Sequence, residues 1–188
     1  MNILFVNACV REGSRTKRLA DHLLASIDGD ITEVYLENEH IQPLDRESLA
    51  RRDVLVSNGE LEDDMLSYAR QFAEADAIVI AAPYWDLAFP ALLKIYLEAV
   101  TVSGVTFCYS EDGTPKSLCK AKKLIYVTTA GGPIFADFGY SYVRTMAEGF
   151  FGIEETVCFK AENLDVIGMD TEKILRETER EIDEYNGQ

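Results

Sequence analysis

Basic residues are scarce in this sequence. It holds 18 Lys and Arg against 33 Asp and Glu, a formal net charge of -15 over 188 residues. Nucleic acid backbones and anionic lipid surfaces bind clusters of Lys and Arg, and a chain this negative repels them. The charge balance therefore argues against nucleic acid and against a membrane surface as partners.

Several familiar signatures are also missing. The cysteines form no C-x-x-C pair, and the two histidines are not close enough in the sequence to act as paired ligands, so we expect no metal site. These residues are Cys9, Cys108, Cys119 and Cys158, with His22 and His40. The apolar runs are far shorter than the ~20 residues that a membrane span requires. No basic segment precedes the first apolar run, and the thiols stand alone, so we expect a cytoplasmic protein.

What is present is the composition of a globular domain. Hydrophobic residues make up 47% of the chain and aromatic residues 10%, which is too apolar for a disordered protein. The length lies within the ~100–200 residues typical of one domain. We therefore expect a single domain over residues 1–188, large enough for a core and a cofactor crevice without disulfides.

Strands and helices alternate along the chain. Short strand-like runs lie at residues 2–7, 31–36, 76–82, 124–129 and 155–160, and the most apolar of them predict strands buried on both faces. Helical spacing of apolar residues occurs at 16–27, 61–75, 90–100, 140–151 and 171–185, with Pro90 in a first turn. Residues 37–58 are polar and irregular and predict a long surface connection. Residues 104–118 look extended around an Asp112-Gly113 turn.

This alternation predicts an α/β fold with a parallel sheet, helices on both faces and right-handed crossovers. For five strands, the flavodoxin-like order 2-1-3-4-5 is the economical doubly wound arrangement. Such sheets bind ligands beyond the carboxyl ends of their strands. The candidate site therefore lies in the loops at residues 8–15, 83–89 and 130–139.

The first of these loops has the features of a phosphate site. It gathers four of the few basic residues and two hydroxyls at the start of a helix: Arg11, Arg15, Lys17, Arg18, Ser14 and Thr16. Helix N-termini offer unpaired N–H groups that bind anions. The alternative is an ordinary Ser or Thr cap with solvated basic residues on the outer helix face. The loop lacks the glycine patterns of a P-loop and of a dinucleotide site, which leaves a mononucleotide phosphate.

The other two loops offer a wall and hydrogen-bond donors for a flat ligand. Tyr84 and Trp85 follow Pro83 at the end of a central strand, and a planar ring system needs such an apolar wall. The alternative is that both aromatic side chains only cap the core. Gly131 and Gly132 let the backbone approach a ligand and direct N–H groups at it, unless they form only a flexible turn.

The order of short motifs is more specific than any single motif. The motifs are Ser14-Arg-Thr16, Ala82-Pro-Tyr-Trp-Asp-Leu87, Pro90-Ala-Leu-Leu-Lys94, Gly104-Val-Thr-Phe-Cys-Tyr109, Ala130-Gly-Gly132 and Ala161-Glu-Asn-Leu-Asp165. In this order, and over nearly the whole chain, the sequence resembles the flavodoxin-like NAD(P)H:quinone oxidoreductases and FMN-dependent NADH-azoreductases.

The resemblance implies a noncovalent FMN. Its phosphate would lie at Cys9, Ser14, Arg15 and Thr16, and its ring at Pro83, Tyr84, Trp85, Asp86 and Leu87. The pyrimidine edge would meet Thr129, Ala130, Gly131 and Gly132. Members of the family form homodimers with the flavins at the interface, and the candidates for substrate-facing aromatics are Phe107, Tyr109 and Phe135.

Two residues depart from the family pattern. Cys9 stands where members often have serine, so Arg11 or Arg15 would compensate for the missing hydroxyl. Asp86 stands where many members have asparagine.

The implied activity is an FMN-dependent NAD(P)H dehydrogenase. Hydride would pass from NADH or NADPH to the flavin, and then to quinones, azo compounds or similar flat acceptors in a ping-pong sequence. No side chain needs to act as acid or base, although Tyr84 or Tyr109 could donate a proton. Two alternatives stay open: a flavodoxin-type one-electron carrier, which an acidic surface suits, and a scaffold without flavin.

Overall fold

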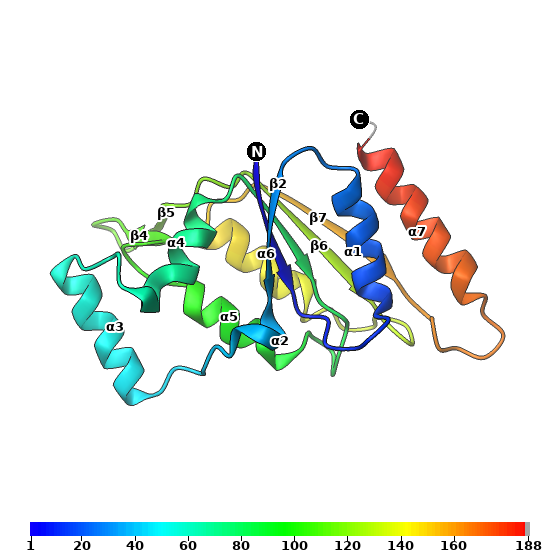
Figure 1. Cartoon of the computed structure of the whole chain (residues 1–188), viewed down its shortest axis with the longest axis horizontal. Helices are drawn as coiled ribbons and strands as arrows, with labels where there is room; N and C mark the ends of the chain where they lie inside the picture. The colour runs from blue at the N-terminus through cyan, green and yellow to red at the C-terminus, as the bar shows by residue number, and fades with distance from the viewer. Residues whose placement is uncertain (187–188) are drawn as a thin grey trace.

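The computed structural model describes residues 1–186. Its main sheet has five parallel strands, β1 (Asn2–Asn7), β2 (Asp30–Tyr35), β3 (Ala77–Ala81), β6 (Lys123–Thr129) and β7 (Glu155–Ala161). They lie in the order β2-β1-β3-β6-β7 (Figure 1). Counted along these five strands, this is 2-1-3-4-5, so the predicted flavodoxin-like order is confirmed.

Helices cover both faces of the sheet. Alternate strand residues point to opposite faces, so Ile3 and Phe5 of β1 pack with α1 (Arg15–Ala25) and α7 (Thr171–Asn186). Leu4 and Val6 pack on the other side, with α4 (Ser67–Glu74), α5 (Ala91–Val100) and α6 (Tyr140–Gly149). The two cores hold the strands rigidly and leave the loops at their carboxyl ends free to form a site.

Residues 37–58 lie mostly at the surface, as predicted, but the predicted irregular conformation is wrong. This stretch contains α2 (Leu36–Glu39) and α3 (Arg46–Asn58). The α3 helix begins with a capping box, in which Asp45 and Ser48 bond each other's backbone N–H, and it ends at Gly59 with a φ of 72°. Leu55 is its only buried residue, so the helix has no apolar stripe to reveal it in the sequence.

Two other helices begin later than predicted. The helix expected from residue 61 starts as a 3₁₀ turn, η1 (Asp64–Leu66), because the Asp63 carboxylate caps it at the Met65 N–H. Pro90 is the N-cap of α5 and precedes its first turn. None of the helices among residues 1–186 is long and apolar enough to cross a membrane.

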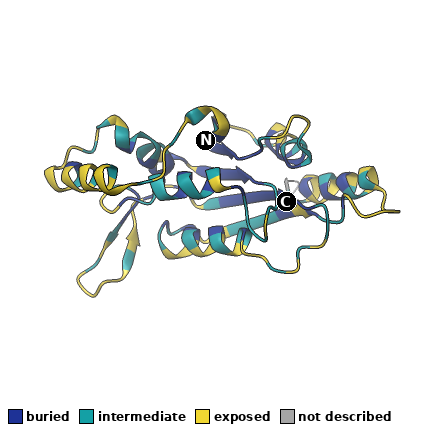
Figure 2. Cartoon of the chain, turned by 90° about the horizontal axis from the view of Figure 1, so that it is seen from below, coloured by how far each residue is buried: buried dark blue, intermediate teal, exposed yellow. Residues whose placement is uncertain are grey.

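The extended stretch at 104–118 is a small antiparallel hairpin, as predicted. Its strands are β4 (Phe107–Tyr109) and β5 (Pro115–Ser117), and Gly113 takes a φ of 81° in the turn. The hairpin projects from the body with an exposed tip (Figure 2). Just after the hairpin, the Lys120 N–H donates to the Ala73 carbonyl at the end of α4, shortly before β3 begins. The hairpin therefore lies at the amino edge of the sheet, opposite the candidate loops.

Candidate functional site

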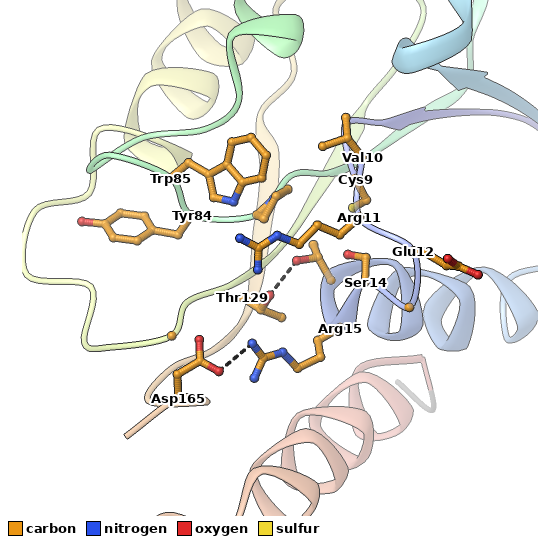
Figure 3. A pocket seen from close by; sticks show the side chains of 14 residues that line it. Cys9, Val10, Arg11, Glu12, Ser14, Arg15, Tyr84, Trp85, Thr129 and Asp165 are labelled. Atoms are coloured by element: carbon orange, nitrogen blue, oxygen red, sulfur yellow. Dashed lines mark hydrogen bonds and ion pairs between the residues drawn. The ribbon is translucent and has the colours of Figure 1, made fainter. Parts of the chain in front are cut away.

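A cavity of about 370 Å³ opens at the carboxyl edge of the sheet, where the three candidate loops meet (Figure 3). This volume lies within the range typical of small-molecule sites. The predicted residues that line it are Cys9, Arg11, Ser14, Arg15, Thr16, Pro83, Tyr84, Trp85, Thr129 and Gly131. Four further residues line it without having been predicted individually: Val10, Glu12 and Gly13 belong to the predicted first loop, and Asp165 ends the Ala161–Asp165 motif.

The first loop leads into the N-terminus of α1, which offers hydrogen-bond donors to an anion. Gly13 takes a φ of 65°, and Ser14 then caps α1 by accepting a hydrogen bond from the Lys17 N–H at 3.3 Å. The Ser14 hydroxyl has its own proton to donate, and the Cys9 thiol is one nearby acceptor. The N–H groups of Arg15 and Thr16 lie in the first turn, where no helical carbonyl can accept from them. These donors belong to residues that line the same end of the cavity.

The basic cluster of this loop separates into different roles. Lys17 pairs with Asp21 at 2.5 Å, and Arg18 pairs with Glu172 and Glu179 of α7. Neither side chain lines the cavity, so for these two residues the alternative of an ordinary capped helix holds. Within residues 1–186, Arg11 has no carboxylate partner, and its guanidinium lies 6.0 Å from the centre of the Trp85 ring.

Arg15 is also committed to a protein partner. It donates to the Leu164 carbonyl at 3.1 Å and to the Asp165 carboxylate at 2.8 Å, and both lie beyond β7. Its guanidinium therefore bonds the segment after β7, and only its backbone N–H is left for the predicted contact with a phosphate. Asp165 follows the carboxyl end of an edge strand, and that position was the signal that could have identified it.

Cys9 contributes a neutral thiol. Its side chain is buried, and its Sγ lies 3.6 Å from the Ala81 carbonyl of β3. Burial raises the pKa of this thiol to about 11, so it carries no charge near neutral pH. A thiol is a weaker hydrogen-bond donor than a hydroxyl, and this one contacts the sheet.

The second loop fixes the two aromatic residues through a strained turn. The N–H groups of Trp85 and Ala88 each donate to the other's carbonyl, and Asp86 and Leu87 between them have φ values of 49° and 71°. Such conformations cost on the order of 1–3 kcal/mol each in residues other than glycine and concentrate at ligand sites. Neither Asp86 nor Leu87 lines the cavity, and the Asp86 side chain is exposed.

Tyr84 ties the second loop to the third. Its backbone N–H donates to the Thr129 carbonyl at 3.0 Å, and its hydroxyl donates to the Ala136 carbonyl at 2.8 Å. The aromatic ring therefore has a fixed position at the cavity wall, with its hydroxyl proton already engaged.

The third loop presents two backbone donors. The carbonyls of Ala130, Gly131 and Gly132 accept hydrogen bonds from the N–H groups of residues 163–165. In a trans peptide the next N–H points opposite to the carbonyl. The N–H groups of Gly131 and Gly132 therefore point away from residues 163–165, and neither has a protein acceptor among the described residues. The Ala130 N–H is used by the Ala161 carbonyl.

A buried hydroxyl pair joins the first loop to the third. The Oγ1 atoms of Thr16 and Thr129 lie 2.6 Å apart, and their residues are 0% and 8% exposed. One of the two hydroxyls donates to the other, and both residues are largely buried at the cavity wall. This contact fixes the spacing between the phosphate-like end of the cavity and the glycine N–H groups.

The three predicted substrate-facing aromatics lie in different places. Phe135 is on the third loop, 79% exposed. Phe107 is buried in the hairpin, with its ring 5.0 Å from Phe150, and Tyr109 packs beside it. The hairpin is at the amino edge of the sheet, so Phe107 and Tyr109 do not reach the cavity of their own chain. Among residues 1–186, no group of His, Cys, Asp and Glu could hold a metal ion.

Comparison with known proteins agrees with this geometry. The FMN-dependent NADH:quinone oxidoreductase 2 of Clostridium acetobutylicum is 38% identical over 94% of this chain and 93% of its own. An FMN-dependent NADH:quinone oxidoreductase of Coprothermobacter proteolyticus is 35% identical over 97% and 96%. An azoreductase from Bacillus anthracis superposes with a TM-score of 0.85 at 24% identity, covering 98% of both chains, which supports the fold. The Flavodoxin_2 model, described as a flavodoxin-like fold, matches residues 1–185, and the chain belongs to this family.

Proposed function

We propose that this protein is an FMN-dependent NADH:quinone oxidoreductase that also reduces azo compounds and similar flat acceptors. The observation that carries the proposal is the 35–38% identity to relatives of that name over more than nine-tenths of both chains. The cavity supports it independently, because its donors suit a phosphate at one end and a planar ring at the other.

The phosphate end has the donor set that FMN requires. Ser14, Arg15 and Thr16 line the cavity at the start of α1, where the Ser14 hydroxyl and two unpaired N–H groups are available as donors and the helix dipole favours an anion. Arg11 supplies the positive charge, since the guanidinium of Arg15 is engaged with Asp165. The Cys9 thiol faces the Ala81 carbonyl, so the phosphate contacts are proposed for these neighbouring residues instead.

The ring end has Tyr84, Trp85 and Gly131 in its lining. Tyr84 and Trp85 would lie against the flavin ring, and the N–H groups of Gly131 and of the neighbouring Gly132 would donate to its pyrimidine edge. Asp86 is exposed and lies outside the cavity lining, so its carboxylate has no part in the proposed flavin site. The strained turn that contains Asp86 holds Trp85 in place before any ligand arrives.

When bound, FMN supplies the hydride chemistry between nicotinamide and acceptor. The chain itself would orient the two partners: with Trp85 and the third loop against the ring, donor and acceptor would occupy the same remaining face in turn. Tyr84 donates its hydroxyl proton to Ala136, so it protonates an acceptor only after that bond opens. NADPH as a second donor and a cytoplasmic location stay predictions.

A homodimer completes the site in this proposal. Tyr109 is 57% exposed at the amino edge of the sheet, too far from its own cavity to meet a substrate there. In a dimer that places the hairpin of one chain over the cavity of its partner, Tyr109 and Phe107 would face the substrate. Phe135, on the cavity's own third loop, would then lie at the interface.

The proposal is tested by loading the purified chain with FMN and following its oxidation of NADH. We expect stoichiometric FMN binding, quenching of Trp85 fluorescence and steady turnover with a soluble quinone. Failure to bind FMN would favour a scaffold without flavin. FMN binding without NADH oxidation would favour the one-electron carrier, and either result would refute the proposal.

A further inference from the structure

An ion pair lies in the wall of the cavity. Arg15, in the first turn of α1, bonds Asp165, which follows β7, at 2.8 Å (Figure 3). Both side chains line the cavity. They are 32% and 62% exposed, so solvent screens the pair only in part.

The Asp165 carboxylate lies against the third loop. The Asp165 N–H donates to the Gly131 carbonyl at 2.8 Å, and a Cβ placed on Gly131 would meet Asp165 Oδ2 at 2.4 Å. Arg15 bonds the other oxygen, Oδ1. A carboxylate thus lies directly beside Gly131, one of the two residues whose free N–H groups point away from residues 163–165.

We propose that Arg15 and Asp165 are positioning residues that together set the reduction potential of the bound flavin. This inference rests on the proposed function. Reduction adds negative charge at the pyrimidine edge of a flavin, beside the glycine N–H groups. The Asp165 carboxylate opposes that charge, and the Arg15 guanidinium offsets the carboxylate. The pair is neutral as a whole, so removing either member leaves the other uncompensated.

The alternative is that the pair only anchors the loop after β7. An anchor would affect oxidised and reduced FMN alike, because both need the same placement of Gly131. If the pair acts electrostatically, loss of Asp165 should favour reduced over oxidised FMN, and loss of Arg15 should disfavour it. The sign of the change, rather than its presence, therefore separates the two explanations.

The test uses the FMN-loaded protein and Asp165→Asn, Arg15→Gln and the double variant. Dissociation constants for oxidised FMN come from Trp85 fluorescence, and midpoint potentials come from anaerobic dye equilibration. We expect Asp165→Asn to favour reduced over oxidised FMN by about three- to tenfold, and Arg15→Gln to disfavour it by a similar factor. A tenfold change corresponds to about 30 mV for two electrons. The double variant should return close to the wild type.

Arg18→Gln is the matched control. The side chain of Arg18 also pairs with carboxylates outside α1, those of Glu172 and Glu179 in α7, and it does not line the cavity. It should leave the potential unchanged. Arg15→Lys keeps the charge and should stay near the wild-type potential, and if Arg15→Gln does not fold, Asp165→Asn alone decides the sign.

Equal losses of affinity in both redox states, or shifts no larger than that of Arg18→Gln, would overturn the inference. So would shifts of the same sign for both single variants. A wild-type protein that binds no FMN would refute the proposed function and this inference together. A wild type that binds FMN and is reduced by NADH, with variants that do not shift, would refute the inference alone.

Discussion

Removing the Thr16 hydroxyl should destabilise the protein far more than a surface change would. In Thr16→Val the side chain keeps its shape and loses its bond to Thr129, whose largely buried hydroxyl then has no protein partner among the described residues. A lost hydrogen bond together with an unsatisfied buried hydroxyl costs about 1–3 kcal/mol. For a chain of this length, each kcal/mol lowers the Tm by about 2–4 °C.

The double variant Thr16→Val with Thr129→Val gives the sharper test. It removes both hydroxyls and leaves neither unsatisfied, so it should cost about 1–2 kcal/mol less than the sum of the single variants. Urea unfolding of the apoprotein, followed by far-UV circular dichroism, measures all three free energies. Thr145→Val, on an exposed turn of α6, is the control. Additive losses would refute the claim that the two hydroxyls bond each other.

Three other perturbations follow from the same contacts. Arg11→Gln should weaken FMN binding about tenfold and barely change riboflavin binding, since Arg11 is proposed to meet the phosphate; equal losses in fluorescence titrations would contradict this. Burial raises the thiol pKa of Cys9 and Cys119 from 9.0 to about 11. Between these pH values the unfolded thiols ionise first, so the unfolding free energy should fall by about 1.4 kcal/mol per pH unit for each thiol; alanine variants without a flatter slope would argue against it. Tyr126→Phe should leave stability unchanged or raise it by about 1 kcal/mol, because its buried hydroxyl has no partner among the described residues. A loss in urea unfolding would instead indicate water bound in the adjacent 80 Å³ cavity.

The sheet and its order could be predicted because they rest on local patterns. Buried strands and amphipathic helices repeat with fixed periods, and five alternating units leave few topologies. The α3 helix could not be found this way. It buries only Leu55 and is specified by its caps at Asp45 and Gly59, which carry no periodic signal.

The candidate loops were also predictable, since parallel strands bring their carboxyl ends to one edge. The partners of the basic side chains were not. Arg15 meets Asp165 across 150 positions and Arg18 meets Glu172 across 154, and only the folded chain brings them together. The sequence shows four cations in one turn, and the structure leaves Arg11 as the one of them without a carboxylate partner in the described residues.

The most direct test of the proposed activity is a pair of anaerobic half-reactions on the FMN-loaded protein. In a stopped-flow instrument, NADH should bleach the visible flavin absorbance in one turnover, and a soluble quinone added afterwards should restore it. The two rates together should account for steady-state turnover in the ping-pong sequence. A flavin that binds and stays coloured with NADH, or that quinone fails to reoxidise, would contradict the proposed function.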